Sequence, residues 1–177
     1  ASALHAASLT LAGLALADWL TPYIMSQSGK SFVRSYQDGY RTELSDIGTD
    51  PNAGVFSASG RNADGELIYD VKYSVGPDHL RITPGNPPGP HRVNFFGCSF
   101  VYGEGLNDDQ TLPYFYSQLA SDVHVMNYGF HGRGAHQALA IMQSGRDTKG
   151  EVNFFLAVPF HAERSACRPV WTNHSPR

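Results

Sequence analysis

The sequence predicts an α/β fold built on a parallel sheet. Three observations predict it. In residues 91–177, short apolar segments typical of strands alternate with amphipathic segments typical of helices. The last strand segment, residues 152–158, is almost continuously apolar, as a strand covered on both faces would be. The length of 177 residues suits one domain, and the 18 glycines and 11 prolines indicate many turns without the repeats of collagen.

A β-rich segment precedes this region. Residues 54–57 and 67–75 carry strand-forming side chains, and the Asn-Ala-Asp-Gly sequence at 62–65 between them predicts a hairpin. In the second strand Val71, Tyr73 and Val75 alternate with polar residues, so we expect one buried face. Residues 84–90, with four prolines, favour neither helix nor strand and predict a linker.

Within the α/β region we expect strands at 93–96, 123–126 and 152–158, with helices at 111–120 and 135–144 between them. The first helix would bury one apolar face, made of Leu112, Phe115, Tyr116 and Leu119. The second would carry Leu139, Ile141 and Met142.

The start of the chain predicts a membrane anchor or the remnant of a signal peptide. Residues 1–17 carry no charged side chain, and Trp19 and Tyr23 stand where an interfacial aromatic belt would lie. A buried Ala/Leu helix of a soluble domain is the alternative. We therefore expect an anchor or signal remnant at 1–23, a β-rich lead segment with linker at 24–90, and the α/β region at 91–177. The expected location is membrane-anchored or exported, on the extracytoplasmic side.

Charge and cysteine content exclude several classes. The net charge of −3 comes with no basic block, so a nucleic-acid partner is disfavoured. Cys98 and Cys167 are too few for a disulfide framework and lack metal-ligand spacing, although a single bridge between them stays open. The eight histidines form no zinc signature. We expect neither a metal nor a cofactor.

Three loops follow the predicted parallel strands, and ligands of such sheets bind beyond the carboxyl ends of the strands. The first, residues 97–105, places Ser99 directly after a strand, as a serine nucleophile requires. The second, residues 127–137, has three glycines whose N–H groups can converge on an oxyanion. The side chain of Asn127 can hold this loop in place. The third, residues 159–164, contains His161. Neither a P-loop nor the Gly-x-Ser-x-Gly elbow of α/β-hydrolases is present.

These loops resemble the SGNH (GDSL-like) hydrolases. Phe96-Gly97-Cys98-Ser99-Phe100, followed by Gly103-Glu-Gly105, is similar to the family's first block, and Asn127-Tyr-Gly129-Phe-His-Gly132 to its second. Residues 69–75 and 80–84 are similar to the strand region that precedes this domain in membrane-anchored bacterial members. The resemblance covers roughly residues 54–164. It implies a flavodoxin-like, three-layer α/β/α parallel sheet, here incomplete because we expect the chain to be part of a longer protein.

The resemblance implies roles for individual residues. Ser99 would be the nucleophile and one oxyanion donor through its backbone N–H, and the N–H of Gly132 would be a second. The family's third donor, an Asn, has no match, and His161 and Arg164 occupy that loop instead. Together with Asn127 and His131, these two residues form the remaining candidate site positions. The family's first-block Asp is Cys98 here, and its Asp-x-x-His block is not matched around His174, because position 171 is Trp.

The function implied is that of a serine esterase or acyl-transfer hydrolase acting on a small-molecule or carbohydrate O-acyl ester. Two other classes stay open. One is a non-catalytic carbohydrate-binding or assembly protein that retains the fold, which the missing Asn favours. The other is an anion binder that uses the glycine loops. Without an identified base, we expect these 177 residues alone to show little or no esterase activity.

Overall fold

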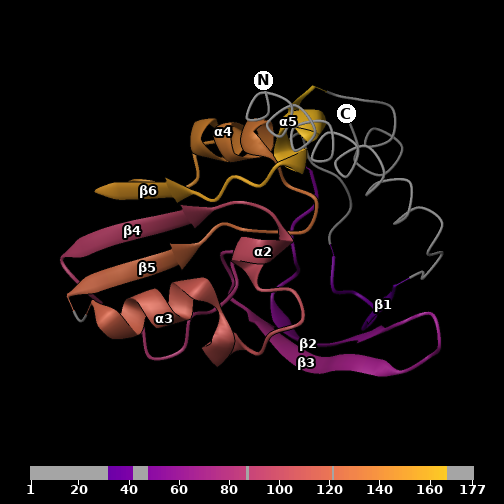
Figure 1. Cartoon of the computed structure of the whole chain (residues 1–177). Helices are drawn as coiled ribbons and strands as arrows, with labels where there is room; N and C mark the ends of the chain where they lie inside the picture. The colour runs from indigo at the N-terminus through magenta and orange to yellow at the C-terminus, as the bar shows by residue number, and fades with distance from the viewer. Residues whose placement is uncertain (1–31, 42–47, 87, 121, 167–177) are drawn as a thin grey trace, which may run out of the picture.

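The computed structural model describes two three-stranded sheets, and α2 and the loops after the parallel strands lie between them (Figure 1). One is antiparallel, in the order β1-β2-β3, and the other is parallel, in the order β5-β4-β6. The described residues are 32–41, 48–86, 88–120 and 122–166. The expected mixed α/β fold with a preceding β-rich segment is confirmed. The predicted anchor at 1–23, Cys167 and His174 lie outside the described residues. Within the described ranges, the structure contains no helix of sufficient length and hydropathy to cross a bilayer.

The antiparallel sheet consists of β1 (Val33–Tyr36), β2 (Gly54–Arg61) and β3 (Leu67–Val75). The β2–β3 pair is the predicted hairpin, with Phe56 opposite Tyr73. Its turn forms because the side chain of Asn62 accepts hydrogen bonds from the N–H groups of Asp64 and Glu66. The expected buried face is confirmed, since Val71, Tyr73 and Val75 are all buried.

In the parallel sheet β4 (His91–Phe96) is central, between β5 (Val123–Asn127) and β6 (Val152–Phe155). Helix α3 (Leu112–Leu119) leads from β4 to β5, and α4 (Ala135–Gln143) leads from β5 to β6. The two helices cover opposite faces of the sheet (Figure 1). Accordingly, Phe95 packs against α3, whereas the adjacent Phe96 packs in the cluster that contains α4.

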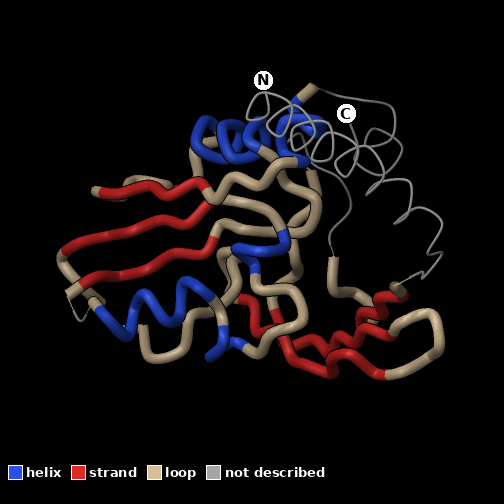
Figure 2. Tube along the Cα trace, in the orientation of Figure 1, coloured by secondary structure: helices blue, strands red, loops and turns tan. Residues whose placement is uncertain are grey.

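Short elements follow the carboxyl ends of the parallel strands. Helix α2 (Ser99–Tyr102) follows β4, the 3-10 helix η1 (Asp108–Gln110) comes next, and α5 (Phe160–Ser165) follows β6. The tube view shows the antiparallel sheet beneath the loops at this edge (Figure 2). One hydrophobic cluster joins the two parts, because Tyr102 and Phe130 of the α/β region pack among the buried side chains of the antiparallel sheet.

Two details of the predicted packing are wrong. The strand at 152–158 ends at Phe155, and its four residues are exposed instead of being covered on both faces; among the described strands β6 is an edge strand that pairs only with β4. On α3, Tyr116 packs against Phe95, but the rest of the predicted apolar face is exposed: Leu112, Phe115 and Leu119. On α4, for which the sequence analysis predicted no buried face, Ile141 is buried and Leu139 and Met142 are exposed.

The predicted linker at 84–90 has neither helix nor strand among its described residues, as expected. It is nevertheless anchored. The Asn86 side chain accepts a hydrogen bond from Val125 N at 2.9 Å and donates one to Val125 O at 2.8 Å. It therefore occupies backbone groups on the side of β5 that faces away from β4.

Candidate functional site

The central strand β4 delivers Ser99 to the edge of the sheet. The strand ends at Phe96, Gly97 and Cys98 make the turn, and Ser99 is the first residue of α2. A Cβ added to Gly97 would lie 2.6 Å from Cγ2 of Val101, so the turn is tight enough to need glycine. Cys98 is a fully buried free thiol, whereas Ser99 is only partly buried. The sequence prediction of a serine on a close turn after a strand is confirmed.

The other two loops meet this turn. The N–H of Phe130, in the loop after β5, donates to the carbonyl of Gly97 at 3.2 Å. The N–H of Leu156, directly after β6, donates to the carbonyl of Phe96 at 2.9 Å. The rings of Phe100 and Phe160, which neighbour Ser99 and His161 in the chain, have centroids 6.2 Å apart. All three predicted loops therefore lie at one edge of the sheet.

Asn127 joins the β5 loop to α2. Its Oδ1 accepts a hydrogen bond from Gly129 N at 3.0 Å, and its Nδ2 donates to the carbonyl of Val101 at 3.1 Å. The approach is close, since a Cβ added to Gly129 would lie 2.6 Å from the backbone nitrogen of Tyr102. The buried Asn127 side chain thus holds the loop, as expected from its position after the strand.

Gly132 has the backbone conformation expected of a turn glycine. Its φ of 78° lies in the left-handed region, which residues with a Cβ adopt at a cost. The next residue, Arg133, is buried and anchors the loop through its guanidinium, which bonds to the carboxylate of Asp50 and to the carbonyl of Tyr128. Gly134 then begins α4 and donates its N–H to Oε1 of Gln137 at 2.7 Å.

His161 is buried in the third loop. Its Nδ1 accepts the N–H of Val158 at 3.4 Å, so the neutral ring carries its proton on Nε2. Burial, with a smaller contribution from Arg164, lowers the pKa of His161, which favours this neutral form at pH 7. The Nε2 atom is buried and has no hydrogen-bond partner within the described part of the chain. Arg164 lies over the ring of Phe160 and donates to the carbonyl of Arg133 at 3.3 Å, which connects α5 to the glycine loop.

His131 takes a different place from the one the loop pattern suggests. Its ring lies in the aromatic cluster between the two sheets, where Nε2 is 2.8 Å from the hydroxyl of Tyr40. Its Nδ1 is 3.4 Å from Oε2 of Glu104. Burial lowers the pKa of His131, although Glu104 opposes this effect. His131 is therefore a side chain of the core that lies directly beside Gly132 in the chain.

Glu104 is the residue that sequence reasoning missed. Its Oε1 accepts a hydrogen bond from the Tyr36 hydroxyl at 2.6 Å and lies 2.7 Å from Nε of Arg34. Burial opposes its ionisation, but the contacts with His131, Tyr36 and Arg34 outweigh burial and lower the pKa of Glu104 to about 2. The available signal was an acidic residue between two glycines, Gly103 and Gly105, within the first motif.

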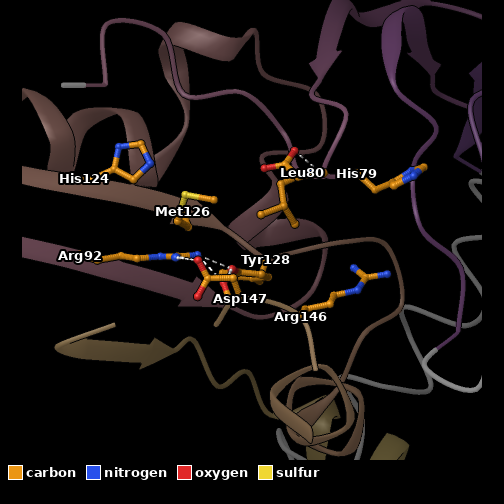
Figure 3. A pocket seen from close by; sticks show the side chains of 9 residues that line it. His79, Leu80, Arg92, His124, Met126, Tyr128, Arg146 and Asp147 are labelled. Carbon is orange, nitrogen blue, oxygen red and sulfur yellow. Dashed lines mark hydrogen bonds and ion pairs between the residues drawn. The ribbon is translucent and has the colours of Figure 1, made fainter. Parts of the chain in front are cut away.

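A separate pocket of about 510 Å³ lies on the α4 side of the sheet (Figure 3). Figure 3 shows Arg92 and Asp147 meeting beside Tyr128, with His124 and Met126 along β5. Its charged groups already have partners, because Arg92 bonds to Asp147 and Arg146 bonds to Asp50. The lining residues are Asp78, His79, Leu80, Arg92, His124, Met126, Tyr128, Arg146 and Asp147. Ser99 is not among them.

Within the described ranges, no group of three or more His, Cys, Asp or Glu side chains is arranged to hold a metal ion. The polar groups at the strand ends are a serine hydroxyl, backbone N–H groups and the imidazole of His161, which suit hydrogen bonding to a developing negative charge. Comparison of the chain with protein-family models and with curated proteins finds no match to either.

Proposed function

We propose that the protein is a serine esterase or acyl-transfer hydrolase of the SGNH type, with Ser99 as the nucleophile. The observation that carries this proposal is the position of Ser99 at the start of α2, just after the central strand β4, where the loops after β5 and β6 converge. The strand order β5-β4-β6, with helices on opposite faces, matches the start of a flavodoxin-like sheet. Ligands of such sheets bind at the switch point beside the central strand.

In the proposed reaction Oγ of Ser99 attacks the acyl carbon of an O-acyl ester, including a carbohydrate O-acetyl group. The hydroxyl proton passes to a general base, and the leaving alcohol takes a proton as the tetrahedral intermediate collapses to an acyl-enzyme. Water, or an acceptor alcohol, then releases the acyl group. The N–H groups of Ser99 and Gly132 bind the oxyanion, and each such donor contributes about 2.7–4 kcal/mol in comparable sites.

Two histidines of these loops, His161 and His131, are not arranged as that base. His161 carries its proton on Nε2 and accepts at Nδ1, and His131 contacts Tyr40 and Glu104 in the core. Neither of these two histidines is therefore assigned as the base. Arg164 and His161 remain proposed contributors to the site through the third loop.

Covalent labelling by a fluorophosphonate tests the nucleophile. We expect the full-length protein to form one adduct, located at Ser99 by mass spectrometry, because only an activated serine reacts readily with this reagent. Ser99→Ala should abolish the adduct, whereas Ser57→Ala, at an exposed serine of β2, should leave it unchanged. Labelling that persists in Ser99→Ala, or its absence from the wild-type protein, contradicts the proposal.

The 177-residue chain alone should hydrolyse p-nitrophenyl acetate no faster than its Ser99→Ala variant. The physical reason is that a serine hydroxyl without a base is a weak nucleophile. Steady-state release of p-nitrophenol measures this, with buffer as the blank. A Ser99-dependent rate well above the blank would show that a base is present in this chain.

A non-catalytic binding protein is the second candidate, and the pocket in Figure 3 favours it because it lies apart from Ser99 and mixes charged with apolar lining residues. Carbohydrate binding that survives Ser99→Ala and is weakened by Tyr128→Phe would support this candidate. Loss of binding in Ser99→Ala would instead place the ligand at the strand-end loops.

A further inference from the structure

Glu104 is bonded to the segment that carries the proposed nucleophile. The N–H groups of Gly103 and Glu104 both donate to the carbonyl of Ser99 at 2.9 Å. Gly103 ends α2 in the left-handed conformation, with φ of 82°, and this reversal brings the Glu104 side chain back toward the core. The backbone position of Ser99 is therefore tied directly to Glu104.

The same Glu104 contacts the residue before the second proposed donor. Its Oε2 lies 3.4 Å from Nδ1 of His131, and the peptide between His131 and Gly132 carries the Gly132 N–H. The His131 ring is held on its other side by the Tyr40 hydroxyl at 2.8 Å. It also packs against the rings of Phe130 and Tyr102, with centroids at 4.8 Å and 5.0 Å. A side chain restrained on several sides limits rotation of the adjoining peptide.

The antiparallel sheet supplies the groups that hold this pair. Arg34 and Tyr36, both on β1, bond to Oε1 of Glu104, and Tyr40 follows β1 by a few residues. Tyr36 and Tyr40 also stack on each other, with centroids 5.2 Å apart. The contacts cross 68 residues of sequence between Tyr36 and Glu104, and 91 between Tyr40 and His131.

We propose that Glu104 and His131 are positioning residues, held by β1 of the antiparallel sheet, that fix the backbone N–H groups of Ser99 and Gly132 relative to each other. This inference rests on the proposed function. It gives the antiparallel sheet an indirect role in catalysis. The residues on and just after β1 hold the Glu104 carboxylate and the His131 imidazole, and these two residues lie next to the segments that carry the oxyanion donors. Neither Glu104 nor His131 needs to touch the substrate.

Glu104→Gln in the full-length protein tests the proposal, because it removes the charge and keeps the shape. The two N–H donors stabilise a negative charge that develops only in the transition state. If Glu104→Gln displaces these donors, the maximal rate of fluorophosphonate labelling should therefore fall about 10- to 100-fold. The reagent concentration that gives half of this rate should stay within about twofold of wild type. Tyr40→Phe, which deletes only the hydroxyl beside His131, should lower the maximal rate less, by roughly 3- to 10-fold.

Asp109→Asn is the matched control, because it removes a carboxylate from an exposed residue five positions away. It should label at the wild-type rate. The amide resonances of Ser99 and Gly132 give a second readout: Glu104→Gln should shift both, and Asp109→Asn neither. Wild-type labelling rates in Glu104→Gln, or shifts confined to one of the two amides, overturn the inference.

Failure of the proposed function looks different. If the wild-type protein forms no adduct at Ser99, the hydrolase proposal falls, and the amide resonances alone decide whether Glu104 couples the two loops. If the wild type is labelled but Glu104→Gln behaves like Asp109→Asn, only the positioning role falls. A fall in rate that accompanies a loss of the folded-state circular dichroism also overturns it, since the effect would then be one of folding.

Discussion

At the scale of single residues, Glu104 shows how an acidic side chain remains ionised inside the structure. Its carboxylate is only 14% exposed but contacts Arg34, Tyr36 and His131. These contacts stabilise the charged form by more than burial destabilises it, which lowers its pKa to about 2. A group whose pKa is lowered by folding stabilises the folded state above its ordinary pKa, and this contribution is lost as the pH falls toward the folded value.

We therefore predict that Glu104→Gln destabilises the protein at pH 7 and that the difference shrinks on acidification. The free energy of unfolding should fall by about 1–3 kcal/mol at pH 7. This is less than the free energy that corresponds to the whole pKa shift of Glu104, because its partner Arg34 is half exposed and solvent screens their interaction. Urea unfolding at several pH values checks this. The gap between wild type and variant should close as the pH falls from about 5 toward 2. A gap that is independent of pH would mean that this carboxylate is not the titrating group.

At the scale of elements, α3 shows which part of an amphipathic pattern becomes buried. Tyr116 lies with its ring centroid 5.3 Å from that of Phe95 and 5.9 Å from that of Phe154, whereas Leu119 is 89% exposed. Buried Pro113 and Ser117 face the sheet instead of Leu112 and Phe115. The helix begins with the Thr111 cap, which sets where its first turn lies on the sheet.

Substitutions on α3 should follow the observed face rather than the sequence pattern. Tyr116→Ala should lower the free energy of unfolding by about 1–3 kcal/mol, because it removes a ring that packs on two others. Leu119→Gln should change it by less than about 0.5 kcal/mol. Thermal unfolding of the two variants measures the difference. Equal losses would show that Leu119 is buried against something in solution.

Strand β5 is protected on its outer side by the loop that precedes β4. Asn86 bonds to both backbone groups of Val125, which places an amide where a neighbouring strand would pair. This contact anchors Asn86 to the sheet, since its side-chain amide bonds to backbone groups that a neighbouring strand would otherwise use. The element is therefore part of the sheet's edge and not only a connection.

Asn86→Ala should lower the free energy of unfolding by about 1–2 kcal/mol and increase self-association, because two hydrogen bonds are lost and a strand edge is exposed. Urea unfolding and light scattering measure the two effects. Asn52→Ala, which removes one exposed hydrogen bond to Gly39, serves as the control. It should lower the free energy of unfolding by less than Asn86→Ala does and should not increase self-association. An Asn86→Ala protein that stays monomeric and as stable as this control would contradict the assignment.

At the scale of the whole molecule, Arg81 joins the two sheets. Its buried guanidinium donates to the carbonyls of Tyr102, Gly103 and Leu106 and pairs with Asp108 at 3.0 Å. It also lies over the ring of Tyr73, 4.5 Å from the centroid. The shared aromatic cluster and this cation lie between the antiparallel sheet and the α/β layer, so we expect the two to unfold together.

Arg81→Met should lower the free energy of unfolding by about 3–5 kcal/mol, because it removes the buried cation that pairs with Asp108 and that donates to three carbonyls. Circular dichroism and tyrosine fluorescence should give coincident urea transitions in the wild type. Arg61→Met, at an exposed arginine with one bond to Gly65, should cost far less. Separate transitions in the wild type, or similar losses in the two variants, would show that the sheets are independent.

Local patterns allowed much of this fold to be predicted. The alternation of Val71, Tyr73 and Val75, the turn at 62–65 and the alternation of strands with helices each depend on neighbours in the chain, and each is confirmed. The placement of Ser99 after a strand and of Asn127 as a loop anchor also follow from local spacing. Their chemical roles stay predictions.

The sequence by itself therefore determined the class of fold and the loops that meet at the strand ends, because period and turn chemistry act over a few residues. Only the tertiary structure decided that His131 turns into the core, that Glu104 is its neighbour, and that β6 is exposed. These outcomes depend on which distant segments pack together: the Tyr40–His131 contact spans 91 residues. No local sequence pattern around His131 indicates that Tyr40 will contact it. That contact places the His131 side chain in the core instead of among the loops at the strand ends.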